Sequence, residues 1–319
     1  MKLKNNSVMK LKTNSVKKRR RFDKDNLQLL ILNLPSLIWV FIFCYLPMVG
    51  LIIAFKKYRI SLGIFGSEWC GLDNFKFLFE SNTSAILVRN TILYNITGMI
   101  LSNVITIAFA LLLYNISCKT SIKIIQSCMF LPYFLSWIVI SYISYALLKY
   151  DNGIFNHILS WFHIAPVSYY NEPVFWPPYL IFFSLWKGAG FSSLVYYGSL
   201  LSVDTELLEA AAIDGCGYLR RIRYIMLPHL KVTAAMLLIL GMGSILKSDY
   251  GLYYYLPQNQ GQLYDTVDVL DTYIMRSVRV TGNYAGSSAA GFVQSIVGCV
   301  LVIAVNTITK KLDEDSSVF

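Results

Sequence analysis

The chain has 319 residues, of which 55% are hydrophobic and only 14% are charged, and its formal net charge is +10. A soluble globular domain contains about 25% charged residues, so the composition argues against a soluble domain and favours a membrane protein.

Residues 1–26 form a basic tail with ten basic and two acidic side chains. The tail repeats itself, because MKLKNNSV is followed by MKLKTNSV. A polar segment of low complexity is expected to be disordered. Phe22 is the single aromatic residue of the tail, so we expect a cytoplasmic anchor near anionic lipid and no nucleic-acid partner.

Six apolar stretches predict six membrane-spanning helices. Three stretches contain no charge and exceed the about 20 residues that a helix needs to cross a bilayer. The fourth contains only Lys187, the fifth is short, and the sixth carries small and amide residues such as Gln294. In chain order the stretches are 27–55, 90–116, 124–148, 175–203, 232–246 and 285–308.

The basic residues predict that both termini are cytoplasmic. In that orientation the cytoplasmic segments hold 18 lysines and arginines in 72 residues, and the outer segments 56–89, 149–174 and 247–284 hold 9 in 98. Basic residues are enriched in cytoplasmic loops. We therefore expect a multi-pass protein of the cell membrane, with residues 309–319 as a second cytoplasmic tail.

The loop 204–230, between the fourth and fifth spans, is the most informative stretch. Asp204 and Thr205 are residue types that begin helices, and Gly215 can adopt the left-handed conformation that ends one. A second helix is expected from about Tyr218 to Met226, and Pro228 is expected to begin the next span. The loop thus predicts two short helices at a sharp angle, with an alanine face that another protein can approach.

Motifs of catalysis and of metal or nucleotide binding are absent from the sequence. The three histidines do not form HExxH, and the chain contains no CxxC, GxSxG or GxxxxGK[ST]. The six cysteines are scattered, so no disulfide framework is expected. We therefore expect no catalytic residue, no metal and no cofactor in this chain.

The spacing within the loop resembles the signature of binding-protein-dependent ABC importer permeases. In that signature Glu-Ala-Ala is followed by three residues, Gly, nine residues, Ile, one residue and Leu-Pro. The matching residues are Glu209, Ala210, Ala211, Gly215, Ile225, Leu227 and Pro228.

The resemblance implies an all-α integral membrane protein with the type I ABC importer architecture, in which the first loop helix couples to a separate ATPase that binds the ATP. It also implies a heterodimer with a second homologous permease, two ATPase subunits and an extracellular solute-binding lipoprotein. The helices within 90–308 would form the transport core, and the helix at 27–55 would be peripheral.

Softer similarities narrow the resemblance to the carbohydrate-uptake class, which includes maltose-permease-like proteins. The stretch GLDNFKFLF at 71–79 resembles that class, and DTVDVLDTYIMR at 265–276 resembles its oligosaccharide subgroup of aldouronate or LplB type. The expected function is therefore the import of sugars, particularly oligosaccharides. A permease for a non-sugar solute (polyamine, phosphate, iron or peptide) is the alternative, and a membrane scaffold or sensor without transport activity is a more distant one.

Two places are candidates for contact with the substrate. Lys187 is the one charge in its span, and an ionisable group there usually faces a cavity or a partner. The second place is the outer end of the fifth span, where aromatic and polar residues alternate: Lys247, Asp249, Tyr250 and Tyr253, with Tyr254, Tyr255, Gln258 and Asn259 beside them. Snorkelling or pairing of Lys187, and an interfacial aromatic belt at the tyrosines, are the structural alternatives.

Overall fold

The computed structural model describes residues 24–312, and nearly all of its regular structure is helical. The predicted disorder of residues 1–26 falls mostly outside this range. Internal contacts divide the chain into two units, residues 1–50 and 51–319. The all-helical membrane class expected from the composition is confirmed.

The described part of the first unit, residues 24–50, is an apolar helix that changes its winding along its length. It begins as α1 (Lys24–Val40), continues as the π-turn Phe41–Tyr45, and passes into the 3₁₀ stretch Leu46–Phe55, which crosses into the second unit. Pro35 inside α1 and Pro47 in the 3₁₀ stretch each lack a backbone donor, which favours such local rewinding. Residues Gln28–Phe55 are long and apolar enough to span a membrane, as the sequence predicts.

The second unit starts with a small hairpin and then turns into the long helices. Strand β1 (Lys56–Lys57) pairs antiparallel with β2 (Glu68–Trp69), and α2 (Gly63–Gly66) lies between them in the chain. The 3₁₀ turn Asp73–Phe75 and α3 (Lys76–Glu80) follow. The long helices are α4 (Asn82–Tyr114), α5 (Lys119–Phe134), α6 (Trp137–Leu148), α8 (Trp176–Leu201), α11 (Leu227–Met242) and α15 (Tyr284–Leu312).

Shorter elements connect these helices. Between α6 and α8 lie α7 (Ile154–Trp161) and the 3₁₀ turns Tyr169–Asn171 and Pro173–Phe175; between α8 and α11 lie α9 (Thr205–Ile213), α10 (Tyr218–Arg221) and the π-turn Ile222–Met226. Between α11 and α15 lie α12 (Tyr250–Tyr255), the 3₁₀ turn Gly261–Leu263, α13 (Tyr264–Val267), α14 (Leu270–Arg276) and the π-turn Ser277–Thr281.

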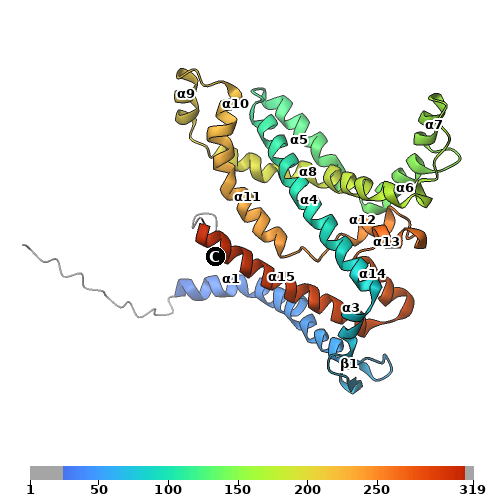
Figure 1. Ribbon diagram of the computed structural model, residues 1–319. Coiled ribbons are helices and arrows are strands. Elements are labelled where there is room, and N and C mark those ends of the chain that lie inside the picture. The colour runs from blue at the N-terminus through green and yellow to red at the C-terminus, as the bar shows by residue number, and fades with distance from the viewer. Residues whose placement is uncertain (1–23, 313–319) are drawn as a thin grey trace, which may run out of the picture. The chain divides into compact units, whose positions relative to one another are not determined.

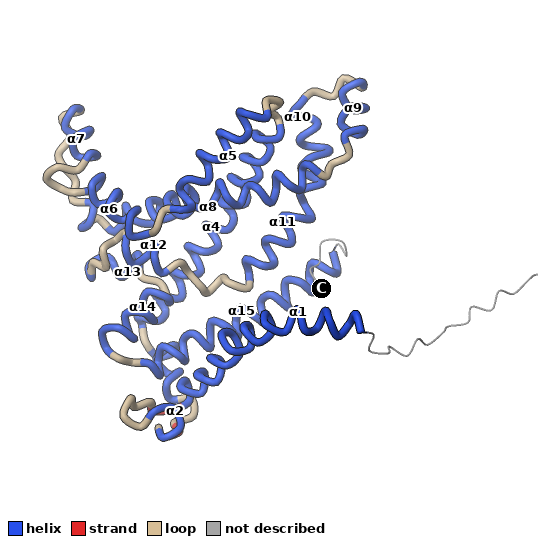
Figure 2. Tube along the Cα trace, turned by 180° about the vertical axis from the view of Figure 1, so that it is seen from behind, coloured by secondary structure: helices blue, strands red, loops and turns tan. Residues whose placement is uncertain are grey.

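Helix α8 is the centre of the second unit. Both α4 and α5 pack along it (Figures 1 and 2). Its first half, with Trp176 and Phe183, shares an aromatic core with α12 and α13, through Leu252 and Val267 among others. Its second half, with Tyr196 and Leu200, packs against the start of α11. The helix of 26 residues, roughly 40 Å long, therefore separates two regions, α9–α10 at one end and α12–α14 at the other.

The count of six spans is not matched in full. Within residues 24–312, four helices are long and apolar enough to cross a membrane, or five when the bent pair α5–α6 counts as one span. Helix α8 falls short of that apolarity. Its only charge is Lys187, so its tryptophans, tyrosines, serines, glycines and prolines account for its lower hydropathy.

The expectation of one continuous helix over 124–148 is wrong. Helices α5 and α6 meet at a bend of 92°. Leu135 and Ser136 are extended at the junction, and the Ser136 hydroxyl accepts a hydrogen bond from the N–H of Val139 at the start of α6. Pro132 disfavours regular winding just before the bend, and the serine cap makes it a defined turn.

The second loop helix is found over Tyr218–Met226 as α10 and the π-turn, and Pro228 lies in the first turn of α11 as expected, but no break separates the two. Residues Tyr218–Met242 form one helix of 25 residues, which includes α10, the π-turn and α11. A π-turn shifts the hydrogen-bond pattern by one residue, so the helix can continue past Pro228, which has no N–H to donate. The expected span 232–246 therefore starts earlier and ends at Met242.

Candidate functional site

The loop 204–230 begins with a well-defined helix. The Asp204 carboxylate accepts a hydrogen bond of 2.9 Å from the backbone N–H of Glu206 and caps α9. Gly215 ends the turn with φ +73°, a conformation that costs other L-residues roughly 1–2 kcal/mol. The N–H of Cys216 donates to the carbonyl of Ala211 at 2.8 Å and closes the end of the helix. The sequence signals for the start and the end of this helix are confirmed.

Five of the seven signature residues are exposed, and Ala211 and Ile225 are half-buried. The exposed residues are Glu209, Ala210, Gly215, Leu227 and Pro228. Ile225 packs against the core formed by Tyr196, Leu200 and their neighbours. Leu227 and Pro228 lie in the first turn of α11. The loop is therefore attached to the core near Ile225, and α9 is exposed to solvent or to a partner.

Large apolar side chains are also exposed on this loop. Leu207, Ile213 and Leu219 expose 58%, 87% and 78% of their surface. Exposed apolar groups gathered on one short segment are typical of a surface that another protein covers.

Lys187 lies at the bend between α5 and α6. Its Nζ donates to the carbonyl of Tyr133 at 2.8 Å, to that of Leu135 at shorter range, and to that of Pro132 at 3.5 Å. The last carbonyls of a helix have no partner within the helix, so Lys187 supplies the donors that the end of α5 lacks. An ammonium has three donors, and all three point at the backbone here.

The same lysine faces two aromatic rings, one on each side of the bend. Its Nζ is 5.7 Å from the centre of the Tyr133 ring and 5.3 Å from that of Trp137. The Trp137 indole N–H in turn donates to a carboxylate oxygen of Asp249 at 2.5 Å. A polar chain therefore runs from α8 through the bend to the start of α12.

Asp249 caps α12, and the helix begins directly against Trp137. The other Asp249 oxygen accepts from the N–H of Gly251 at 2.9 Å. A Cβ at Gly251 would lie 2.3 Å from the Trp137 ring, so only glycine allows this approach. The sequence-predicted residues Lys187 and Asp249 are thus brought together, with Trp137 between them.

The predicted tyrosines separate into two environments. Tyr253 is buried with 7% of its surface exposed, and its ring lies 5.1 Å from that of Tyr94. Tyr250 is half-buried and stacks on Tyr254 at 4.8 Å, and Tyr255 meets the edge of this pair. Tyr253 therefore packs in the core, and the other three form an aromatic cluster.

The backbone between α11 and α12 is irregular, and side chains from distant helices satisfy it. The Asn95 amide on α4 donates to the carbonyls of Ile245 at 2.8 Å and Lys247 at 3.0 Å. The Gln294 amide on α15 donates to the carbonyl of Leu246 at 2.7 Å. Transporters place substrate sites at such interrupted helices, because irregular backbone at membrane depth is tolerated only within protein or beside a cavity.

A cavity of about 200 Å³ opens at this interruption. It is lined by Asn95, Met99, Gly241, Ser244, Ile245 and Lys247. Lys247 and Ser244 are exposed. The predicted residue Lys247 therefore lies at an open polar cavity.

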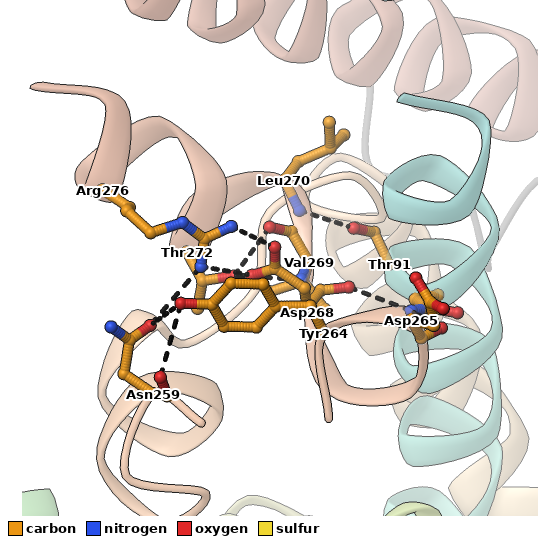
Figure 3. A network of polar contacts seen from close by, with 10 residues as sticks. Thr91, Asn259, Tyr264, Asp265, Asp268, Val269, Leu270, Thr272 and Arg276 are labelled. Carbon is orange, nitrogen blue, oxygen red and sulfur yellow. Dashed lines mark hydrogen bonds and ion pairs between the residues drawn. The ribbon is translucent and has the colours of Figure 1, made fainter. Parts of the chain in front are cut away.

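A buried polar network supports this side of the molecule (Figure 3). Arg276 forms an ion pair with Asp268, and the side chains expose 18% and 6% of their surface. The guanidinium lies 4.0 Å from the centre of the Tyr264 ring. The Tyr264 hydroxyl donates to the Asn259 side chain at 3.0 Å.

The network is tied to α4 by two residues of that helix. The Asn90 amide donates to the carbonyl of Asp268 at 3.0 Å, and the Thr91 hydroxyl accepts from the N–H of Leu270 at 3.0 Å. The stretch 265–276 thus has a structural role, because it fixes α13 and α14 to the N-terminal part of α4.

Asp271 closes the interrupted segment from the other side. Its carboxylate accepts a hydrogen bond of 2.7 Å from the N–H of Ser248. Burial raises the pKa of this carboxyl, and the Ser248 N–H opposes that effect. Among residues 24–312, no three His, Cys, Asp or Glu side chains are grouped so that they could hold a metal.

A family model described as "Binding-protein-dependent transport system inner membrane component" matches residues 119–313. The match covers more than half of the chain and includes the whole loop 204–230. The chain belongs to this family. It is therefore a multi-pass membrane permease component of a transport system.

Individual permeases of the family are similar over nearly the full length. The chain is 32% identical to the polygalacturonan/rhamnogalacturonan transport system permease protein YteP of Bacillus subtilis (strain 168) over 287 residues, which are 90% of this chain and 89% of YteP. It is also 32% identical to LplB of the same organism, over 90% of both chains.

A solved structure is similar in fold as well as in sequence. One chain of a bacterial ABC transporter involved in the import of the acidic polysaccharide alginate matches with a TM-score of 0.81 and 30% identity, over 91% of this chain and 97% of that chain. The helix arrangement described above is thus that of an ABC importer permease.

Several polar residues of this permease were missed by the sequence reasoning. Asn95 and Trp137 lie in apolar stretches that look like ordinary spans, and Asp271 lies in a stretch that was noted only for its resemblance. Arg279, which lies 5.8 Å from the Tyr250 ring, was not singled out at all. A lone amide in an apolar run was the available signal for Asn95 and Gln294, because an unpaired amide in a membrane is costly.

Proposed function

We propose that this chain is the membrane-spanning subunit of an ATP-driven importer of oligosaccharides, and that its substrates carry carboxylates. The observation that carries the proposal is the full-length similarity to YteP, whose name gives polygalacturonan and rhamnogalacturonan as substrates. The alginate transporter, also similar over most of both chains, imports an acidic polysaccharide.

The energy for import comes from a separate ATPase, which docks on the loop 204–230. Glu209, Ala210, Ala211 and Gly215 present the surface of α9, Ile225 packs against the core, and Leu227 and Pro228 lie in the first turn of α11. The exposed apolar side chains of α9 and α10 support this role. The chain itself carries no catalytic residue in this proposal.

The remaining partners are a second homologous permease and an extracellular solute-binding protein. The alginate transporter has been solved in complex with a periplasmic protein that holds an alginate pentasaccharide, and we extend that arrangement to this chain. Two copies of the ATPase complete the complex.

The substrate path passes the interruption between α11 and α12. Lys247, Asp249 and Tyr250 line the path in this proposal, because Lys247 and Asp249 are exposed and the half-buried Tyr250 lies beside the exposed Arg279. Lys187 and Tyr253 do not touch the substrate in this proposal. Lys187 stabilises the end of α5, and Tyr253 packs in the core beside the path.

The experiment that tests the function is uptake by the complete complex in proteoliposomes. With ATP inside and loaded binding protein outside, we expect uptake of labelled tetragalacturonate and none of glycerol 3-phosphate or of a polyamine. Uptake of a non-sugar solute in place of the oligosaccharide would overturn the proposal. Stimulation of ATP hydrolysis by the loaded binding protein provides an independent readout.

Both termini and the loop 204–230 are cytoplasmic in this proposal. The test uses Ser160→Cys and Thr205→Cys, each in a background without the six native cysteines. Both positions are exposed, so accessibility depends on the side of the membrane. A membrane-impermeant maleimide should label residue 160 and not residue 205 in intact cells. The opposite pattern would reverse the orientation.

A further inference from the structure

Two arginines near the end of α14 lie three residues apart and have different surroundings. Arg276 is neutralised by the buried carboxylate of Asp268. Arg279 is exposed, and within residues 24–312 it has no hydrogen bond or ion pair; its recorded neighbour is the ring of Tyr250, at 5.8 Å. The donors of the Arg279 guanidinium are therefore available to a ligand.

The hydroxyl group of Tyr250 lies in the same cluster. Its oxygen is buried without a hydrogen-bond partner in the part of the chain that the structure describes. A buried hydroxyl without a partner destabilises a protein. Burial also raises the pKa of Tyr250 to about 12, so the hydroxyl stays protonated and can donate to an acceptor.

The negative charge beside this pair is already compensated. Both oxygens of Asp249 accept hydrogen bonds, from Gly251 and from Trp137. The charge of Asp249 also interacts with that of Lys187. Arg279 is therefore the charge of the cluster that has no hydrogen-bond or ion-pair partner among residues 24–312, and an anion that binds here is stabilised by it.

The aromatic faces beside Arg279 define the shape of the ligand. Tyr250 and Tyr254 stack at 4.8 Å with an angle of 26° between their rings, and Tyr255 stands at 89° to Tyr254. Such rings offer flat apolar surfaces with polar tips, which suit the C–H face and the hydroxyls of a sugar ring. A guanidinium binds a carboxylate through two parallel hydrogen bonds.

We propose that Arg279 and Tyr250 form a subsite that recognises the carboxylate of a uronate unit during import. The carboxylate lies on the Arg279 guanidinium, the Tyr250 hydroxyl donates to it, and the sugar ring lies against the tyrosine cluster. This inference rests on the proposed function and adds residues that select charged over neutral sugars.

The test compares charged and neutral forms of one sugar in the complete complex. The probes are tetragalacturonate and its fully methyl-esterified form, which has the same backbone without charge. Arg279→Gln is expected to lower uptake of tetragalacturonate about tenfold, in line with the loss of one charge-assisted contact, and to leave uptake of the ester unchanged. Arg279→Lys should retain part of the selectivity, because it keeps the charge and loses the paired geometry.

Two further variants separate the parts of the subsite. Tyr250→Phe removes only the hydroxyl and is expected to lower tetragalacturonate uptake severalfold. Lys57→Gln is the matched control, because it removes an exposed positive charge that lies in strand β1 and outside the tyrosine cluster. It should leave uptake of both probes at the wild-type value.

A protection experiment gives a readout that does not depend on the transport rate. Arg279→Cys in a background without native cysteines should react with a maleimide, and tetragalacturonate should slow that reaction in the ATP-trapped complex while the ester does not. Three results would each overturn the subsite. Arg279→Gln could import both probes at the wild-type rate, it could lose uptake of both probes equally, or tetragalacturonate could fail to protect Arg279→Cys from the maleimide. Failure of the wild-type complex to import tetragalacturonate would instead overturn the proposed function.

Discussion

The loop 204–230 and the network around Asp268 lie at opposite ends of α8, and they are held together in different ways. The loop depends on local features: a cap two residues away, a glycine turn, and few buried side chains. The network depends on hydrogen bonds between Asn90 and Asp268, which are 178 residues apart in the chain. A surface that must meet a partner can be formed locally, whereas a buried polar region must be assembled from distant helices.

The largest expected effect comes from breaking the network. Asp268→Ala leaves the Arg276 guanidinium buried without its partner, which costs about 3–5 kcal/mol in buried ion pairs. We expect a large fall in the thermal midpoint of the purified protein. The double variant Asp268→Leu with Arg276→Met should recover much of the stability, because it removes both charges.

An exposed ion pair provides the matched control for that prediction. Lys76 and Asp73 lie 2.8 Å apart with side chains that are 64% and 54% exposed. Asp73→Ala should leave the thermal midpoint unchanged, since exposed pairs contribute little. Equal shifts for Asp73→Ala and Asp268→Ala would show that burial does not distinguish the two pairs.

Lys187→Met is expected to have the second largest effect. It removes three contacts to the carbonyls at the end of α5, and one hydrogen bond from a charged group is worth about 1.5–3 kcal/mol. Hydrogen exchange at residues 133–137 should become faster and the thermal midpoint should fall.

The same variant separates two roles for the lysine. A role at the helix end predicts lower stability with unchanged selectivity among substrates. The expectation that Lys187 touches the substrate predicts normal stability, normal assembly and altered uptake. Normal exchange at the bend together with altered selectivity would therefore contradict the role at the helix end.

Gly215→Pro and Glu209→Lys should affect the partner more than the fold. Proline cannot adopt the φ of +73° found at Gly215, and the lysine reverses a charge on the exposed face of α9. Both variants should fold with a near-normal thermal midpoint and lose co-purification of the ATPase. Wild-type co-purification and transport by both would show that this loop does not dock the ATPase.

The smallest effect is expected for Asp204→Ala. Loss of a helix cap costs about 1 kcal/mol, and here it would weaken only the first turn of α9. We expect the affinity for the ATPase to fall about fivefold and the thermal midpoint to stay the same. Asp204→Ser should restore the affinity, because serine also caps helices. An unchanged affinity in Asp204→Ala would show that the turn is ordered without its cap.

The same contrast explains what the sequence could and could not reveal. Asp204 and Gly215 act within a few residues of their own positions, so spacing alone predicted the start and end of α9. The bend between α5 and α6 was missed because the donors that stabilise it come from Lys187, 52 to 55 residues away. In a stretch without charges, Pro132 and Ser136 are compatible with a continuous membrane-spanning helix, so they did not indicate a bend.

The candidate site shows the same limit. Lys247, Asp249 and Tyr250 could be selected by residue type; the first two are exposed and Tyr250 is half-buried. Tyr253 has the same residue type as Tyr250 but is enclosed by Tyr94 and its neighbours. Residue type could not separate them, because the difference arises from how α12 turns against α4 and α8.

The unbroken helix from Tyr218 to Met242 has a mechanical consequence. A rigid rod of 25 residues is about 38 Å long, so each degree of tilt about one end displaces the other end by roughly 0.7 Å. A break at Pro228 would absorb such a tilt, and the helix continues through this residue without one. A tilt of the end near Tyr218 therefore displaces the end near Met242, and with it the segment that carries Lys247.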